Sequence, residues 1–276
     1  MPTFIKNEKD IPSPAFITKA VHDLTPFSTI EILDLGLETK PQYTQLHNFN
    51  ILPSSYVTDS ANINAKEVFI KGMDYGKSYE LKGSYLILAE SSSSTTTTAI
   101  ASIIALGYDL KNIKTSTIDK SLSLINDEMN NFEKLGIVSN NILLFCAGFL
   151  LEASRRFHVV LAGGVQLAAC LLIADKLKGD VLMRVKSDNI TLATTAWIAK
   201  DENSNIQNIL SNLSYTPHAI YTDFSFASAE IPALKKYDDG KAKEGAGAGA
   251  ALAYAVTNKQ TNEEVLEAIE YLIYIM

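Results

Sequence analysis

A single glutamate, Glu244, stands among residue types that are typical of a site for an anionic ligand. Lys241 and Lys243 supply positive charge just before it, and three glycines follow at alternate positions, beginning with Gly245. Glycines let the backbone approach a ligand closely. The alanine-rich segment after them favours a helix, whose unpaired first N–H groups would lie beside the acid. The stretch is therefore predicted to hold an anionic ligand next to a carboxylate.

The same stretch has a purely structural interpretation. A glycine and alanine run is also what close helix packing needs, and an acid that precedes a helix is favoured by the helix dipole alone. Perturbed or helix-terminal acids are often only structural. Both interpretations stay open on the local pattern.

A second candidate site is the hydroxyl-rich run from Ser91 to Thr98, which directly follows Glu90. The apolar run SYLILA precedes it and AIASIIALG follows it, so a strand, a turn and a helix are predicted in succession. Hydroxyl donors at such a turn suit an anion site, although turns and helix caps use the same side chains. A second turn of this kind occurs at Gly163 and Gly164, after the apolar strand predicted over residues 157–161.

Periodicity and turn residues predict the elements that would position these groups. Strands are expected over residues 29–35, 84–89, 157–161, 190–195 and 219–224. Helices are expected over residues 15–24, 62–79, 99–107, 119–132, 141–155, 165–177, 206–213, 228–237 and 262–276, with one more after the glycines that follow Glu244. Residues 37–61 show no clear period and are predicted to form an extended connection.

The repeated order of strand and helix predicts an α/β fold, with a mostly parallel sheet covered by helices on both faces. Ligands bind at the carboxyl ends of the strands in such folds. Glu90, Gly163, Ser225 and Glu244 all fall at or just after predicted strand ends. We therefore expect them to converge on one cleft.

The amino-acid composition and net charge limit the kinds of molecule that the protein is expected to bind. The chain of 276 residues has 47% hydrophobic and 20% charged residues and a formal net charge of -7, which indicates a globular protein and argues against nucleic-acid or anionic-membrane binding. The polar N-terminus has no signal-peptide pattern and the two apolar runs are too short or interrupted to span a bilayer, so a cytoplasmic protein is expected. Cys146 and Cys170 are interpreted as buried thiols. The four histidines show no ligand spacing, and neither a metal nor a cofactor is expected.

Six segments that together cover most of the chain carry a family resemblance. They are IPSPAFITKAV from Ile11, ILDLGLETKP from Ile32, LAESSSSTTTTAIASIIALGYD from Leu88, LEASRRFHVVLAGGVQLAA from Leu151, ITLATTAWIAKD from Ile190 and TDFSFASAEIPALKKYDDGKAKEGAGAGAALAYA from Thr222. In this order they resemble the nicotinate-nucleotide-dimethylbenzimidazole phosphoribosyltransferase family, particularly its archaeal-type branch. Six motifs in order are far more specific than any one of them.

The resemblance implies transfer of the 5-phosphoribosyl group from nicotinate mononucleotide to a benzimidazole-type base, giving an alpha-ribazole phosphate for the lower ligand of cobamides. It also implies a homodimer with a Rossmann-like sheet. We expect one phosphoribosyltransferase-like domain over residues 1–276, with a small helical part built from about residues 1–25 and 260–276. The nicotinate of the donor is a cationic pyridinium and a good leaving group, so the reaction needs no metal.

The resemblance assigns roles to individual residues. Glu244 matches the family's general base, which would take the ring N–H proton while the other ring nitrogen attacks C1′. The loop after Glu90 and the turn at Gly163 match segments that line the nucleotide site, and Ser225 and Lys241 match positions near the ribose phosphate. The full predicted substrate-binding set is Glu90, Ser91, Thr96, Thr97, Thr98, Gly163, Gly164, Ser225, Lys241 and Gly245.

Three departures from the family pattern bear on activity. One is that no clear match is found for the phosphate-contacting lysine expected after the second helix, for which Lys120 is the candidate. Ser93, Ser94 and Thr95 replace a proline and two glycines, so hydroxyl groups would have to replace backbone amides as phosphate donors. The N-terminal segment that precedes IPSPAF in related enzymes is not found, which bears on the acceptor pocket. The alternative is therefore a non-catalytic or altered-specificity nucleotide-binding paralogue. A kinase or dehydrogenase is disfavoured, because no GxxxxGK[ST] occurs and GAGAG does not follow a strand.

Overall fold

The structure is a computed structural model that describes residues 11–42, 45–55, 57–92, 95–110 and 116–275. Its centre is a sheet of four parallel strands in the order β3-β4-β5-β6, so each strand lies beside the next one in the chain. A separate two-stranded parallel sheet pairs β1 with β2. The strands are β1 (Ile32–Asp34), β2 (Leu46–Asn48), β3 (Leu86–Ala89), β4 (Val159–Ala162), β5 (Ile190–Thr195) and β6 (His218–Thr222).

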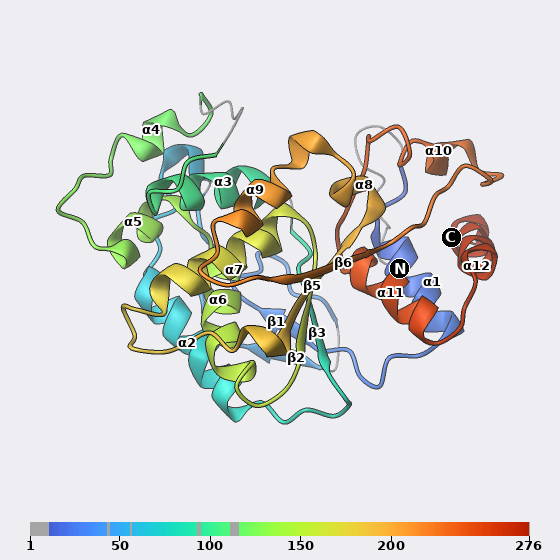
Figure 1. The fold of residues 1–276 in the computed structure, drawn as a ribbon, viewed down its shortest axis with the longest axis horizontal. Coiled ribbons are helices and arrows are strands. Elements are labelled where there is room, and N and C mark those ends of the chain that lie inside the picture. Colours follow the sequence, from blue (N-terminus) through green and yellow to red (C-terminus); the bar gives the residue numbers. More distant parts are fainter. Residues whose placement is uncertain (1–10, 43–44, 56, 93–94, 111–115, 276) are drawn as a thin grey trace.

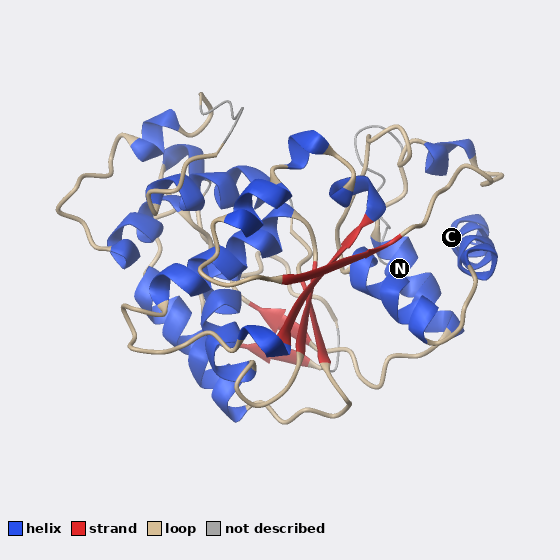
Figure 2. Cartoon of the chain, viewed as in Figure 1, coloured by secondary structure: helices blue, strands red, loops and turns tan. Residues whose placement is uncertain are grey.

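Helices cover both faces of the central sheet, as the α/β prediction required (Figure 1; Figure 2). The longer helices are α1 (Ala15–Leu24), α2 (Ala65–Ser78), α3 (Thr95–Ala105), α5 (Asn131–Val138), α6 (Asn141–Ala153), α7 (Val165–Leu177), α11 (Ala248–Thr257) and α12 (Asn262–Ile275). The shorter ones are α4 (Asp119–Leu122), α8 (Ala196–Ala199), α9 (Ile206–Ser211) and α10 (Pro232–Lys235), with 3-10 turns η1 (Val57–Asp59), η2 (Ser187–Asn189) and η3 (Glu202–Ser204).

Alternate residues of each strand face different helices. Leu88, Leu161 and Leu192 belong to a core shared with α6 and α7, which we call the larger core. Val160 and Ala193 point to the other face, where Ala250 of α11 packs. Because both faces are covered there, β3 and β4 are apolar along their whole length, whereas the edge strand β6 is largely exposed and begins with His218.

Within the larger core, α2 and α6 pack closely against each other because each helix has a glycine at their contact. A Cβ atom built on Gly148 would lie 2.0 Å from the carbonyl oxygen of Phe69, and one on Gly72 would lie 2.1 Å from the carbonyl oxygen of Phe145. No side chain fits in either gap. Asn140 caps α6 by accepting a hydrogen bond from the amide of Leu143 at 2.9 Å, which fixes where this buried helix begins.

A second core, the end core, lies on the other side of the sheet. It joins buried residues of α1, α10, α11 and α12 with the segment that follows β6, and α1 packs against both α11 and α12. Figure 1 shows this group at one end of the molecule, opposite α4 and α5. The assignment of residues 1–25 and 260–276 to a separate subdomain stays a prediction, and residues 1–10 and 276 lie outside the described residues.

Two predicted elements were wrong. The helix expected over 119–132 is interrupted: α4 ends at Leu122, the side chain of Asn126 accepts from the amide of Glu128 in a turn, and Asn130 begins α5 with a capping box. The connection over 37–61 contains β2 and η1. No helix in the described part of the chain is long and apolar enough to cross a bilayer.

Candidate functional site

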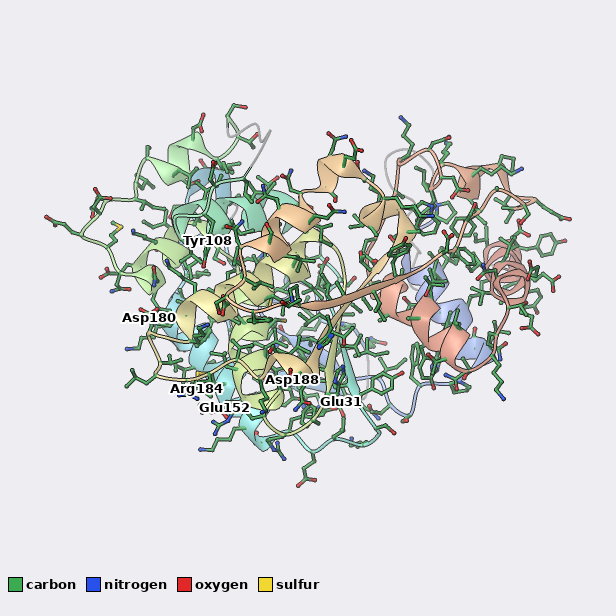
Figure 3. The ribbon with its side chains drawn as sticks, in the orientation of Figure 1. Glu31, Tyr108, Glu152, Asp180, Arg184 and Asp188 are labelled. Atoms are coloured by element: carbon green, nitrogen blue, oxygen red, sulfur yellow. The ribbon has the colours of Figure 1, made fainter. Side chains whose placement is uncertain are left out.

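The loop that carries Glu244 lies across the carboxyl ends of the central strands. The amide of Ala246 donates to the carbonyl oxygen of Glu90, just after β3, at 3.1 Å. The hydroxyl of Thr195, the last residue of β5, donates to the carbonyl oxygen of Lys243 at 2.5 Å. These two hydrogen bonds fix the loop on either side of Glu244. By contrast, Glu152 and Asp188, which are labelled in Figure 3, precede β4 and β5 in the chain. They belong to the segments that enter the amino ends of these strands.

The two oxygens of the Glu244 carboxylate have different surroundings. Oε1 accepts hydrogen bonds from the amides of Gly245 at 3.0 Å and Gly249 at 3.2 Å. Oε2 is buried and has no hydrogen-bond partner among the described residues. One oxygen therefore orients the carboxylate and the other is available for a ligand.

Burial raises the pKa of Glu244 to about 7. The amides of Gly245, Gly249 and Thr195 oppose this rise, and the charge of Glu90 adds to it. Burial likewise raises the pKa of Glu90 to about 7, against a hydrogen bond from the amide of Ser92. Glu90 Oε2 is also buried without a partner among the described residues. Two neighbouring carboxyl groups can thus change protonation state near neutral pH.

The glycines after Glu244 are required by close contacts. Gly247 has a φ of +85°, and a Cβ atom there would lie 3.0 Å from the Cβ of Ala89. A Cβ atom on Gly249 would lie 2.4 Å from the carbonyl carbon of Thr194 and 2.8 Å from Oε2 of Glu244. The first turn of α11 therefore rests directly on β5, and this contact puts the Gly249 amide against the carboxylate.

Glu244 opens into a cavity of about 470 Å³. The cavity lies between the first turns of α3 and α7, where Gln166 donates to the hydroxyl of Thr96 at 3.0 Å, and the segment after α8. Its lining residues are Thr96, Ile100, Val165, Gln166, Ile198, Asp201, Asn203, Ser204, Asn205, Lys243 and Glu244. This volume is in the range of small-molecule sites.

An ion pair joins two walls of the cavity. The ammonium of Lys243 contacts Oδ2 of Asp201, and both side chains are largely buried, with 31% and 19% exposed. The contact with Lys243 holds the pKa of Asp201 below its usual range, which favours the ionised pair. Oδ1 of Asp201 is used separately, because it accepts from the amide of Asn203 at 3.0 Å and caps η3.

The structure brings part of the predicted set together. Glu244 and Thr96 line the cavity, and Gly245 and Glu90 lie beside Glu244. Gly163 and Gly164 are buried between β4 and α7, directly before the lining residues Val165 and Gln166.

Other predicted residues do not line the cavity. Thr98 is buried and Thr97 half-buried in the first turns of α3, and Ser91 is exposed. Lys241 is exposed, and the exposed Ser225 donates to Asp238 at 3.0 Å. Residues 93–94 of the hydroxyl-rich run lie outside the described residues. The binding roles of all these residues remain predictions.

Sequence reasoning missed Asp201, Asn203, Asn205 and Gln166, and noted Lys243 only as positive charge. The run DENSN from Asp201 follows β5 and the short α8. The rule that ligands bind after strand ends could have singled it out. Its pairing with a lysine 42 residues later had no sequence signal.

Some known proteins are similar to this chain in sequence and others in structure. No protein-family model matches the chain. The UPF0284 protein of Methanocaldococcus jannaschii is 29% identical over 279 residues, covering 95% of this chain and 77% of the relative. The UPF0284 proteins of Microcystis aeruginosa and Sulfurisphaera tokodaii are each 28% identical and cover 95% and 94% of this chain and 76% of each relative.

Two crystal structures from Thermus thermophilus share the fold. The nicotinate-nucleotide-dimethylbenzimidazole phosphoribosyltransferase matches with a TM-score of 0.60 at 16% identity, over 92% of this chain and 71% of that one. CobT matches with a TM-score of 0.54 at 14% identity, over 96% and 80%. The chain thus has the fold of these phosphoribosyltransferase structures and is related in sequence to the UPF0284 proteins of archaea and cyanobacteria.

Proposed function

We propose that the protein transfers the 5-phosphoribosyl group of nicotinate mononucleotide to a benzimidazole-type base and gives an alpha-ribazole phosphate for cobamide lower-ligand synthesis. The observation that carries the proposal is the buried, unpartnered Oε2 of Glu244 in a cavity of ligand size. The phosphoribosyltransferase fold supports the class of reaction. The resemblance of the chain's motifs supports the substrates.

Glu244 acts as the general base in this reaction. One ring nitrogen of the acceptor attacks C1′ of the ribose, the bond from C1′ to the nicotinate nitrogen breaks, and nicotinate leaves with that electron pair. The other ring nitrogen loses its proton to Oε2. A base with a pKa of about 7 is largely ionised at slightly alkaline pH and still binds a proton effectively, which suits this role.

The rest of the reduction in the activation barrier comes from the positioning of the bound reactants. The amides on Oε1 prevent the carboxylate from rotating, and the polar side chains of the cavity offer hydrogen bonds to a ribose and a phosphate. Orientation of bound reactants can contribute about 7–11 kcal/mol, more than the proton transfer alone.

A homodimer belongs to the same proposal. α12 leaves Tyr271, Tyr274 and Ile275 exposed, with 65%, 89% and 55% of each side chain accessible. Such an apolar surface suits a second copy of the chain. Light scattering during size-exclusion chromatography tests the oligomeric state. A monomer at micromolar concentration would contradict the proposed homodimer.

The test of the reaction is release of nicotinate from nicotinate mononucleotide in the presence of 5,6-dimethylbenzimidazole. Native protein, Glu244→Gln and the control Glu152→Gln are compared at equal concentration. Glu152 lies in the last turn of α6 and does not line the cavity. We expect the control to retain native activity and Glu244→Gln to lose roughly 10²- to 10⁴-fold in kcat.

Equal activity of native protein and Glu244→Gln would contradict the role of the base. No product from native protein would contradict the reaction. If nicotinate mononucleotide still raised the melting temperature in that case, the protein would be a nucleotide-binding paralogue.

A further inference from the structure

The cavity wall that contains Lys243 has the features of a phosphate site. The first turns of α3 and α7 both contribute lining residues, and helix N-termini carry partial positive charge. α7 has 13 residues and no acidic residue in its first turn. Among the described residues that line the cavity, Lys243 is the one lysine or arginine. The lining also carries the carboxylates of Asp201 and Glu244, so the attraction for an anion comes from Lys243 and the two helix N-termini alone, and Asp201 occupies the lysine.

The contacts of Lys243 show which part of it can move. Its carbonyl oxygen is held by the Thr195 hydroxyl, and the next residue, Glu244, is held by the amides of Gly245 and Gly249. The backbone is therefore fixed, while the long side chain is 31% exposed and lines the cavity. An exchange of partners requires only rotation of the lysine side chain.

Asp201 can release the lysine without losing its structural role. Oδ1 caps η3 through the amide of Asn203, and only Oδ2 contacts the ammonium. A phosphate carries about -1.5 to -2 charges at neutral pH, against -1 for a carboxylate, and offers three acceptor oxygens. It would also gain from the two helix N-termini.

We propose that Lys243 binds the phosphate of the nucleotide substrate, and that Asp201 pairs with Lys243 in the empty site and is displaced when the phosphate enters. This inference rests on the proposed function and specifies where its donor binds. Asp201 lowers phosphate affinity, because it competes for the lysine and repels the incoming anion. The exchange also brings the phosphate next to the residue that precedes the base.

The residues expected from the resemblance to contact the phosphate are less suited to it. Lys241 is exposed and does not line the cavity. Ser225 donates to the carboxylate of Asp238, which also accepts from the indole of Trp197 at 2.7 Å. A phosphate at Ser225 would face that carboxylate. At Lys243 the ammonium can leave Asp201 by rotation of its own side chain, while Oδ1 of Asp201 keeps its contact with the amide of Asn203.

The test is a set of binding titrations by calorimetry with three probes: inorganic phosphate, nicotinate mononucleotide and nicotinate riboside, which lacks the phosphate. The variants are Asp201→Asn, Lys243→Met and Lys243→Arg. Asp201→Asn keeps an oxygen that can cap η3 and removes the negative charge. Asp59→Asn is the matched control, because Asp59 pairs with Lys120 at 2.8 Å, both side chains are exposed, and neither lines the cavity.

We expect Asp201→Asn to bind phosphate and nicotinate mononucleotide about 3- to 10-fold more tightly than native protein, with nicotinate riboside unchanged. Lys243→Met should lose about 10-fold or more toward both phosphate-bearing probes, and Lys243→Arg should retain binding. The control should match native protein. Thermal unfolding establishes that each variant is folded.

Weaker binding of nicotinate mononucleotide to Asp201→Asn would overturn the proposal and make Asp201 a substrate ligand. Unchanged binding by Lys243→Met, or no binding of any probe to native protein, would also overturn it. The titrations do not depend on turnover. If the protein forms no product but the variants show the expected order of affinities for the phosphate-bearing probes, the phosphate site would be supported and only the catalytic function would be contradicted.

Discussion

The amide of Ala246 donates a hydrogen bond to the carbonyl oxygen of Glu90 at 3.1 Å, and so ties the loop that carries Glu244 to the end of β3. This contact brings two acidic residues that are far apart in the chain, Glu90 and Glu244, into one neighbourhood. Burial raises the pKa of Glu244, and the charge of Glu90 adds a smaller rise. The two carboxyl groups are therefore expected to titrate as a coupled pair.

The first prediction concerns pH. Because the base must be ionised, the rate of phosphoribosyl transfer should fall about tenfold per pH unit below a pKa of about 7 and level off above it. Glu90→Gln removes the charge that raises the pKa of Glu244, so the acidic limb of the kcat profile should move to lower pH. The profile is measured by nicotinate release from mildly acidic to mildly alkaline pH, with constant ionic strength.

The direction of that shift is the decisive observation. A limb that stays in place or moves to higher pH in Glu90→Gln would show that the two carboxyl groups are not coupled. A change in rate at the plateau without a shift would instead indicate contact between Glu90 and the substrate.

The second prediction concerns Thr195 as a positioning residue. It is fully buried, and its hydroxyl holds the carbonyl oxygen of Lys243. Thr195→Val keeps the shape and removes the donor, and the unpaired carbonyl should destabilise the folded state by about 1–3 kcal/mol. We expect kcat to fall by about tenfold or more, with KM changed far less, because the base loses its orientation. Thr195→Ser should restore kcat.

The control for this prediction is Thr191→Val on the same strand. The Thr191 hydroxyl contacts His158 at 3.0 Å, near the other end of β5. It should leave kcat close to native. Equal losses of kcat in the two valine variants, or no rescue by serine, would indicate that Thr195 acts only through general stability.

The third prediction concerns the contact between α11 and β5. Gly249→Ala would place a methyl group against the backbone of Thr194 and against Oε2 of Glu244. We expect a loss of about 1–3 kcal/mol in the free energy of unfolding, measured in urea, together with loss of activity. Gly179→Ala is the control, since a Cβ there meets no atom within 4 Å, and it should change stability by less than about 0.5 kcal/mol. Native-like activity in Gly249→Ala would show that the loop can relax without moving the base.

Local sequence signals located some elements well. The helix predicted over 15–24 and the strand over 190–195 have the observed bounds of α1 and β5. Pro12, Ser13 and Pro14 restrict the chain before α1, and β5 is an uninterrupted apolar and β-branched run. Such signals act within a few residues and need no partner.

Tertiary context decided the elements that the sequence did not reveal. β2 contains Leu46, His47 and Asn48, a short and largely polar run that is extended because it pairs with β1. The same limit applies to the site. Glu244 was predicted to be functional from its neighbours, whereas the pairing of Lys243 with Asp201 depends on how α8 and the loop before α11 meet.

The packing of the end core determines when, during synthesis, the site can form. The hydroxyl of Tyr237 donates to the carbonyl oxygen of Pro12 across a separation of 225 residues, and α1 packs on α12. During synthesis, most of the larger core has left the ribosome before α12 exists, but α1 must wait for its partners. Because α11 also carries the amide that orients Glu244, we expect a nascent chain to fold its sheet first and become competent for its ligand only after α11 and α12 have emerged.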